Sequence, residues 1–263
     1  MRSIDINCDL GESFGNWSMG NDPEIMAEIT TANVACGFHA GDPVTMLRTV
    51  ALAAEHRVAI GAHPGLPDLL GFGRRRMVLT PEDAGAYILY QVGALREALR
   101  HNDLALHHVK PHGAFFEVLR DQPGLAEAAV DALVRTSPGV LIYWPAPTEG
   151  TAFCDAARAR GMRVVGEVYP DLGYDAEGRL ILQRSKQHTD TEQASEQVRT
   201  FLETGSVRTV DGTLLPLVAD SICVHGDGPN AVQVARAVRR AITEAGCDIQ
   251  AIEAPGARPA AAA

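Results

Sequence analysis

One pattern recurs along this chain and leaves few folds open. A short apolar run, typical of a buried strand, ends in a polar residue and is followed by glycine or proline and a helix start. In NVACGFHAGDP at 33–43, His39 follows the apolar run, and Asp42 and Pro43 suit the N-cap and first turn of a helix. SIDINCDLGES, VAIGAHPG, LALHHVKPHG, RVVGEVYPD and SICVHGDG repeat the pattern. Because an α/β barrel gathers the carboxyl ends of its strands around one mouth, we expect these polar residues to meet there.

The alternation of strand and helix patterns predicts seven βα units. We therefore predict an α/β fold, an incomplete (β/α)7 barrel, ahead of a closed eight-stranded barrel and an open doubly wound sheet. A DG turn between two apolar runs near 206–217 predicts an inserted hairpin. One domain is expected over residues 1–250, with a disordered Pro/Ala tail at 251–263. The strands are expected at 4–7, 32–36, 58–62, 104–109, 140–144, 163–168 and 221–224.

Helical periodicity also predicts which faces are buried. The helix at 43–56 is expected to bury Leu47, Val50, Ala51 and Ala54. The helix that starts at a capping box of Thr80 and Asp83 is expected to bury Ile88, Val92, Leu95 and Leu99.

Charge and composition exclude several classes of partner. The chain has 23 basic and 33 acidic residues, a formal net charge of −10, which disfavours nucleic acid and anionic membranes. No apolar run approaches the roughly 18 residues that span a bilayer, and MRSIDINCD lacks the apolar core of a signal peptide. We therefore expect a cytoplasmic protein with no membrane partner. The five cysteines contain no CxxC pair, so neither a disulfide framework nor a zinc knuckle is expected.

The strand ends supply a set of titratable side chains. Imidazoles and carboxylates at one face suit either metal ligation or general acid/base catalysis, and the metal content stays open. Lys110 could hold a carboxylate or an oxyanion, and one of the arginines at 74–76 could face an anion. Asp42 and Asp227 also suit helix starts, whereas His107 and His108 receive no role. The full set is Asp9, Glu12, His39, Asp42, His63, Lys110, His112, Glu167, Asp171, Arg184, His225 and Asp227.

Six blocks in order carry a family resemblance: DINCDLGESFG, NVACGFHAGDP, GAHPGLPDLLGFGRR, HVKPHGAFF, GEVYPDLGYDAEGRL and CVHGDGPNAV. Over about residues 3–245 the chain resembles the LamB/YcsF lactam-utilisation family, the A subunit of ATP-hydrolysing 5-oxoprolinase. The resemblance implies a seven-stranded barrel similar to the glycoside hydrolase/deacetylase fold. It also implies a cytoplasmic enzyme subunit that works with B and C subunits to open 5-oxoproline to glutamate, with ATP hydrolysed to ADP and phosphate.

On this hypothesis ATP, with Mg²⁺, activates the lactam carbonyl by phosphorylation. Lys110 and a mouth histidine would stabilise the oxyanion or phosphate, Asp9 or Glu167 would act as general base, and the other histidines would orient groups or shuttle protons. The expected catalytic residues are Asp9, His39, His63, Lys110, His112, Glu167 and His225. The expected substrate-binding residues are Asn7, Glu12, Asp171, Arg184 and Asp227.

Two other functions stay open. The chain could be a metal-dependent deacetylase or amidase, with Asp9 and two histidines holding zinc or another divalent ion, or a non-catalytic scaffold subunit. A homo-oligomer is also open.

The chain departs from the family pattern in one block. Where the family usually has Ala-Asp-Arg after Glu-Val-Phe, this chain has Pro170, Asp171 and Leu172 after Tyr169. The usual proline-arginine at the end of the block is here Gln183-Arg184. If the missing arginine holds the substrate carboxylate, another cyclic amide becomes the expected substrate.

Overall fold

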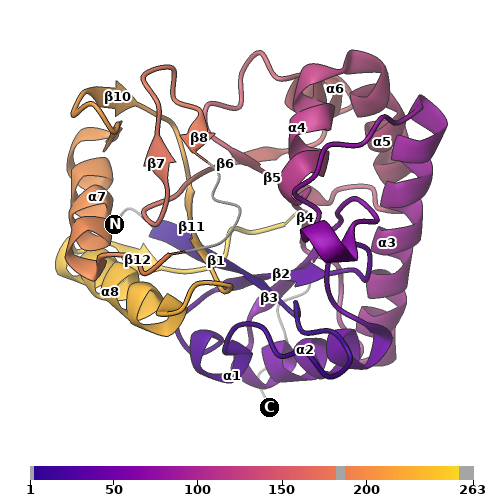
Figure 1. Cartoon of the computed structure of the whole chain (residues 1–263), viewed down its shortest axis with the longest axis horizontal. Helices are drawn as coiled ribbons and strands as arrows, with labels where there is room; N and C mark the ends of the chain where they lie inside the picture. The colour runs from indigo at the N-terminus through magenta and orange to yellow at the C-terminus, as the bar shows by residue number, and fades with distance from the viewer. Residues whose placement is uncertain (1–2, 182–186, 255–263) are drawn as a thin grey trace.

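The computed structural model describes residues 3–181 and 187–254. Within them, seven parallel strands form a closed ring, because β1 pairs with β2 and also with β11. The helices lie around the outside of this ring (Figure 1). The predicted seven-stranded α/β barrel is therefore confirmed, and seven strands are enough to close it. In spatial order the ring strands are β1 (Ser3–Leu10), β2 (Thr31–Ala35), β3 (Ala59–His63), β4 (His108–Val109), β5 (Leu141–Pro145), β6 (Val164–Val168) and β11 (Ser221–His225).

Local signals set several helix ends. The Asp42 side chain accepts hydrogen bonds from the backbone N–H groups of Val44 and Thr45, and the Thr80–Asp83 capping box is formed. Among the described residues, none of the helices combines the length and apolarity needed to cross a bilayer. The helices are α1 (Asp22–Ile25), α2 (Pro43–His56), α3 (Pro81–His101), α4 (Gly113–Asp121), α5 (Pro123–Thr136), α6 (Ala152–Ala159), α7 (Thr191–Thr204) and α8 (Ala231–Glu244). Of these, α4 was not predicted.

The buried face of α2 differs from the prediction, whereas that of α3 agrees with it. In α3 the four predicted residues are all buried. In α2 the buried residues are Met46, Thr49, Val50 and Ala53, and Leu47 is exposed. Both sets in α2 follow helical spacing, so periodicity alone allowed either face. Packing against the barrel selects the one that contains Met46.

Hairpins extend the plain βα repeat. The predicted hairpin forms from β9 (Ser206–Arg208) and β10 (Leu214–Pro216). A second one, from β7 (Gly173–Tyr174) and β8 (Leu180–Ile181), follows β6 on the side of the mouth. The loop after β3 contains a 3-10 turn, η1 (Leu69–Gly71).

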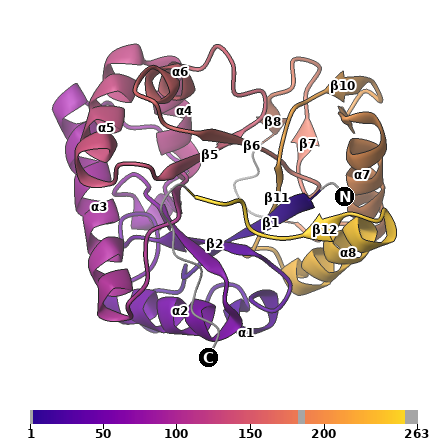
Figure 2. The ribbon, with the colours of Figure 1, turned by 180° about the vertical axis from the view of Figure 1, so that it is seen from behind.

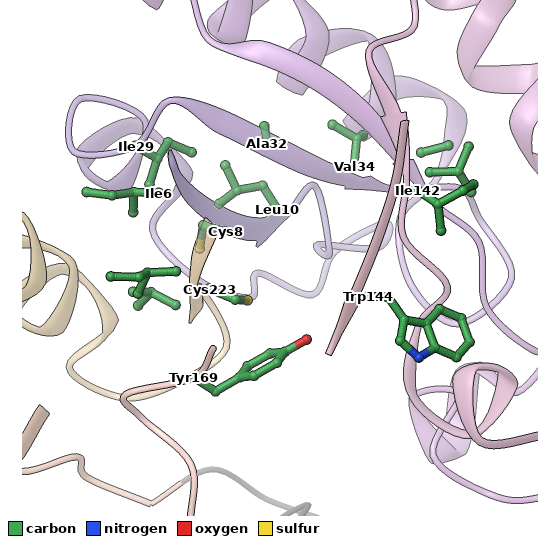
Figure 3. Close-up of a cluster of buried hydrophobic side chains, with 14 of the residues drawn as sticks. Ile6, Cys8, Leu10, Ile29, Ala32, Val34, Ile142, Trp144, Tyr169 and Cys223 are labelled. Atoms are coloured by element: carbon green, nitrogen blue, oxygen red, sulfur yellow. The ribbon is translucent and has the colours of Figure 1, made fainter. Parts of the chain in front are cut away.

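The apolar core lies between the ring and its helices, and the ring interior is polar. Ile6, Leu10 and Val34 belong to the apolar cluster shown in Figure 3. Since successive side chains of a strand point to opposite faces, Asp5 and Asn7 of β1 point to the other side and lie inside the ring. The polar face of β1 therefore lines the interior of the barrel.

A short C-terminal segment covers the end of the ring opposite the mouth, where the strands begin. The strand β12 (Asp248–Ile249) pairs with the first residues of β1, and Figure 2 shows the chain after it crossing the ring. Ile252 and Ala254 pack against a cluster that includes Tyr143. Residues 251–254, predicted as the start of a disordered tail, thus lie against the barrel. Residues 255–263 lie outside the described residues, and a domain end at 250 stays a prediction.

The packing of α3 generates a stability test on two adjacent residues. Ile88 is fully buried and Leu89 is 49% exposed. Ile88→Ala should lower the free energy of unfolding by about 2–5 kcal/mol, because it leaves a cavity against α5, whereas Leu89→Ala should change it by less than about 0.5 kcal/mol. Urea denaturation followed by circular dichroism measures both. Equal losses in the two variants would show that α3 is packed with a different face.

Candidate functional site

A buried ammonium group stands at the centre of the barrel mouth. Lys110, just after β4, places Nζ 3.2 Å from Asp9 Oδ1 and 3.3 Å from Glu167 Oε1. The same Nζ lies 3.2 Å from Asn7 Oδ1 and 2.9 Å from Cys223 Sγ. These partners come from β1, β6 and β11, so closure of the ring is what brings them together.

The electrostatic balance keeps this centre ionised. Burial disfavours the charge of Lys110, yet Asp9 and its other neighbours raise the pKa of this ammonium well above its ordinary value. Burial also opposes ionisation of Asp9, but His63 and Lys110 hold the pKa of the Asp9 carboxyl well below its usual range. Asp9 is therefore a carboxylate at neutral pH, free of a proton of its own but a weak base.

Two buried amides below the mouth orient the carboxylates. Asn7 Nδ2 donates to Glu167 Oε2 at 2.9 Å and to Ser221 Oγ at 2.7 Å. Asn33 Nδ2 donates to Asp9 Oδ1 and to Asn7 Oδ1, both at 2.8 Å. Asn7 was predicted to bind substrate, but all its polar atoms already bond to the protein inside the ring. Its position suits orientation of Glu167 instead.

Three histidines cluster beside Asp9. His63 Nε2 lies 3.4 Å from Asp9 Oδ2 and 3.0 Å from His112 Nδ1. The His39 ring stacks on His112 at 3.8 Å between centroids, with 6° between the planes. Burial, with the neighbouring imidazoles, holds the pKa values of His39 and His112 well below the ordinary histidine value. Both rings are therefore neutral at physiological pH.

Glu12 extends this cluster. Its Oε1 lies 3.7 Å from His39 Nε2, and the residue is buried. Burial raises the pKa of the Glu12 carboxyl well above its ordinary value, with further contributions from Asp9 and Asp227. Asp227 in turn forms an ion pair with Arg74, whose Nη2 lies 2.8 Å from Oδ2.

Asp171 orients the ring of His225 at the mouth. Its Nδ1 lies 2.9 Å from Asp171 Oδ2, and its Nε2 faces Asp9 Oδ2 at 3.9 Å. A carboxylate that fixes one ring nitrogen leaves the other to exchange a proton in the site. The Tyr169 ring lies beside His225, and its hydroxyl donates to Glu167 Oε1.

A cavity of about 60 Å³ lies at this mouth. Its polar wall includes Asp9, Arg74, Lys110 and His225. Leu172, which is 7% exposed, belongs to its apolar wall together with Phe116, Tyr169 and Leu180. The residue that departs from the family pattern thus lies where it can contact a bound ligand.

Most of the predicted site residues converge, with a few exceptions. Of the three arginines at 74–76, only Arg74 lines the cavity, while Arg75 and Arg76 pair with Asp68 and Glu117 away from it. Asp42 caps α2 and so has the structural role considered for it. Arg184 lies outside the described residues.

The sequence analysis did not predict the hydrogen-bonded polar side chains inside the ring, on the side of the site away from the mouth. We call this set, which contains Asp5, Asn33, His107, His108 and Tyr143, the polar column. His108 Nε2 lies 2.6 Å from Asn33 Oδ1, and His107 joins His108 to the backbone carbonyl of Ile252. Tyr143 donates from this column to Asp5 Oδ2 at 3.1 Å. Asp5 shares the face of β1 that carries Asn7 and Asp9, so the alternation in β1 was a usable signal. Nothing in the sequence linked it to the two histidines.

Two groups of side chains offer ligand atoms close enough for one metal ion. The first is Glu12, His39, His63 and His112, and the second is Asp9, Cys223 and His225. Within each group the ligand atoms lie within 4.8 Å of one another.

Known proteins resemble this chain over almost its whole length. The model of the LamB/YcsF family matches residues 4–256. The A subunit of 5-oxoprolinase from Bordetella pertussis is 47% identical over 251 residues, which cover 95% of this chain and 98% of that protein. The crystal structure of a lactam utilization protein from Thermus thermophilus superposes with a TM-score of 0.87 at 42% identity, covering 95% of this chain and all of that one.

A more distant structure shares the fold alone. A putative cellobiose-phosphate cleavage protein from Enterococcus faecalis gives a TM-score of 0.53 at 13% identity, covering 94% of this chain and 96% of that one.

The polar column predicts a pH dependence that Asp5→Asn should remove. Burial raises the pKa of Asp5 from 3.8 to about 6, although Ser221, Thr30, Thr31 and Tyr143 donate to it. Between these values the folded state binds the proton more tightly than the unfolded state, so stability falls as pH rises. The contribution is about 3 kcal/mol. Urea titrations from pH 4 to 6.5 should show the wild-type free energy of unfolding falling by about 2 kcal/mol relative to Asp5→Asn, because part of the change already lies below pH 4. A constant difference across the range would contradict this pKa.

Proposed function

The chain belongs to the LamB/YcsF family, and from this premise we propose that it is the A subunit of an ATP-dependent 5-oxoprolinase. In this reaction the γ-phosphoryl group of ATP passes to the lactam carbonyl oxygen, and water adds to the activated carbon. The ring C–N bond then breaks as the nitrogen takes a proton. Hydrolysis of the remaining acyl phosphate gives glutamate and phosphate. ATP coupling makes chemical sense because an unactivated lactam is a poor electrophile.

The observation that carries this proposal is the buried centre in which Lys110 pairs with Asp9 and Glu167, and of which Lys110 and Asp9 line the mouth cavity. Asp9 is the better general base, because it is a carboxylate that lines the cavity. Glu167 is fully buried and already bonded to Asn7, Tyr169 and Lys110. It therefore suits the positioning of Lys110 rather than proton transfer.

The other groups of the wall have complementary roles. Lys110 places positive charge beside the oxyanion or phosphate that develops on the lactam oxygen. His225, held by Asp171, is placed to relay a proton between Asp9 and the leaving nitrogen. Arg74 supplies a guanidinium at the cavity for the substrate carboxylate or phosphate.

The proposal includes partner subunits and a cytoplasmic location. The B and C subunits would supply what this chain needs for the ATP-coupled reaction, and Mg²⁺ would accompany the nucleotide. The purified chain should be incubated, alone and with both partners, with 5-oxoproline, ATP and magnesium, while glutamate and phosphate are followed together. Glutamate formed only in the full mixture is the expected result. If the folded subunits hydrolyse ATP without forming glutamate, this substrate assignment is wrong.

The Lys110–Glu167 ion pair can be tested by neutralising both partners together, while Asp9 keeps His63 and Asn33 as neighbours. The double variant Lys110→Met with Glu167→Gln should lower turnover by more than tenfold, because it removes the charge beside the reacting oxygen. Arg76 of the loop after β3 and Glu117 of α4, which do not line the cavity, give the control, Arg76→Met with Glu117→Gln, which should retain activity. A loss below tenfold in the Lys110 variant would remove this centre from the mechanism.

Leu172 generates a prediction about substrate choice. Leu172→Arg should lower KM for 5-oxoproline about tenfold, because a charge-assisted hydrogen bond to its carboxylate contributes roughly 1.5–3 kcal/mol. KM for 2-pyrrolidinone, which lacks the carboxylate, should not fall, and Leu172→Met should change neither value. Equal changes for both lactams would mean that position 172 does not contact the carboxylate.

A further inference from the structure

His63 and His112 face each other in an arrangement that a cation would stabilise, and unlike the similar contact of His107 with His108 it adjoins two further candidate ligands. His63 Nδ1 lies 2.6 Å from the backbone carbonyl of Lys110, and His112 Nε2 lies 2.8 Å from that of Phe72. A carbonyl oxygen only accepts hydrogen bonds, so both of these nitrogens carry the hydrogen. In neutral rings the other nitrogens, His63 Nε2 and His112 Nδ1, then present lone pairs to each other across 3.0 Å.

A proton or a metal ion could relieve this repulsion, and the surroundings distinguish them. A shared proton would satisfy His63 and His112, with Asp9 Oδ2 3.4 Å from His63 Nε2, but it would leave His39 unsatisfied. Both ring nitrogens of His39 are buried with no hydrogen-bond partner among the described residues, although this residue is only 1% exposed. The Glu12 carboxylate lies 3.7 Å from His39 Nε2. One ion could use all four side chains, because their ligand atoms lie within 4.8 Å of one another.

The detailed geometry suits coordination. Two nitrogens bound to one ion at about 2.0–2.1 Å lie roughly 3.0–3.4 Å apart, and the observed separation is 3.0 Å. Metal-bound histidines usually donate their second ring N–H to a carbonyl or carboxylate, as His63 and His112 do here.

The wall around His39 is shaped to admit its ring. A Cβ at Gly65 would lie 2.4 Å from His39 Nδ1, and one at Gly73 would lie 2.6 Å from His39 Cβ. Gly73 also has φ +63°, which side chains rarely adopt. These glycines hold a buried imidazole with two unused nitrogens against the other two rings.

The second group of candidate ligands, Asp9, Cys223 and His225, is less suited to a metal ion. Lys110 Nζ lies 2.9 Å from Cys223 Sγ and 3.2 Å from Asp9 Oδ1. An ammonium ion already supplies the positive charge there, so a metal cation would be repelled.

We propose that Glu12, His39, His63 and His112 bind one divalent transition-metal ion of the zinc type. Three imidazole nitrogens and one carboxylate are ligands that Zn²⁺ and Co²⁺ accept. The site adjoins the cavity, because His63 and His112 also line it. This inference does not depend on the lactam reaction, since binding can be measured without substrate, nucleotide or partner subunits.

Cobalt titration of the full chain tests the site. After dialysis against a chelator, the protein is titrated with Co²⁺ by calorimetry and by visible absorption, and Zn²⁺ is added in competition. We expect one Co²⁺ per chain, a visible d–d absorption band, and loss of that band when Zn²⁺ displaces the cobalt. Absence of stoichiometric binding would overturn the proposal and leave a shared proton between His63 and His112.

Two variants identify the ligands. His39→Gln should weaken Co²⁺ binding by at least about tenfold, and it breaks no hydrogen bond of the described structure. His56→Gln, at an exposed histidine on α2, is the matched control and should bind as the wild type does. Binding that is unchanged in His39→Gln would place the ion elsewhere and overturn this assignment. Circular dichroism verifies that both variants are folded.

Discussion

The mouth of this barrel depends on the two buried ion pairs that Lys110 forms with Asp9 and Glu167. Taking three charged groups out of water is costly, and removing one partner of such a set typically costs about 3–5 kcal/mol because the others stay buried without compensation. The residues come from β1, β6 and the segment after β4. The ring must therefore close in the correct register before the charges can compensate one another.

The interior of the ring is built to support those charges. Asn7 and Asn33 donate to the carboxylates from the side away from the mouth, and His108 Nε2 donates to Asn33 Oδ1 in the next layer. Most barrels of this type fill the interior with branched apolar side chains. Here an amide and imidazole column fixes the direction of each carboxylate, at the cost of burying polar groups that must all find partners. The segment around Ile252 covers the lower end of this column.

The mouth divides into two regions with different chemistry. Around Lys110 the positive charge is an ammonium ion, with Asp9 ionised and His225 aligned to exchange protons. Around His39 three imidazoles meet Glu12. Asp9 lies between the regions, in contact with both Lys110 and His63. A change of charge in either region therefore alters the electrostatic environment of the Asp9 carboxylate.

The amino-acid sequence by itself determined the seven βα units, the helix caps and the set of polar strand ends, because periodicity, capping and turn preferences are local properties of the chain. It did not determine the buried face of α2, since Met46 and Leu47 both fit helical spacing. Only the tertiary structure decided that Asn7 is bonded inside the ring, that Leu172 lines the cavity, and that His63 Nε2 and His112 Nδ1 lie 3.0 Å apart. These depend on distances between strands far apart in the chain, which ring closure sets and no local pattern encodes.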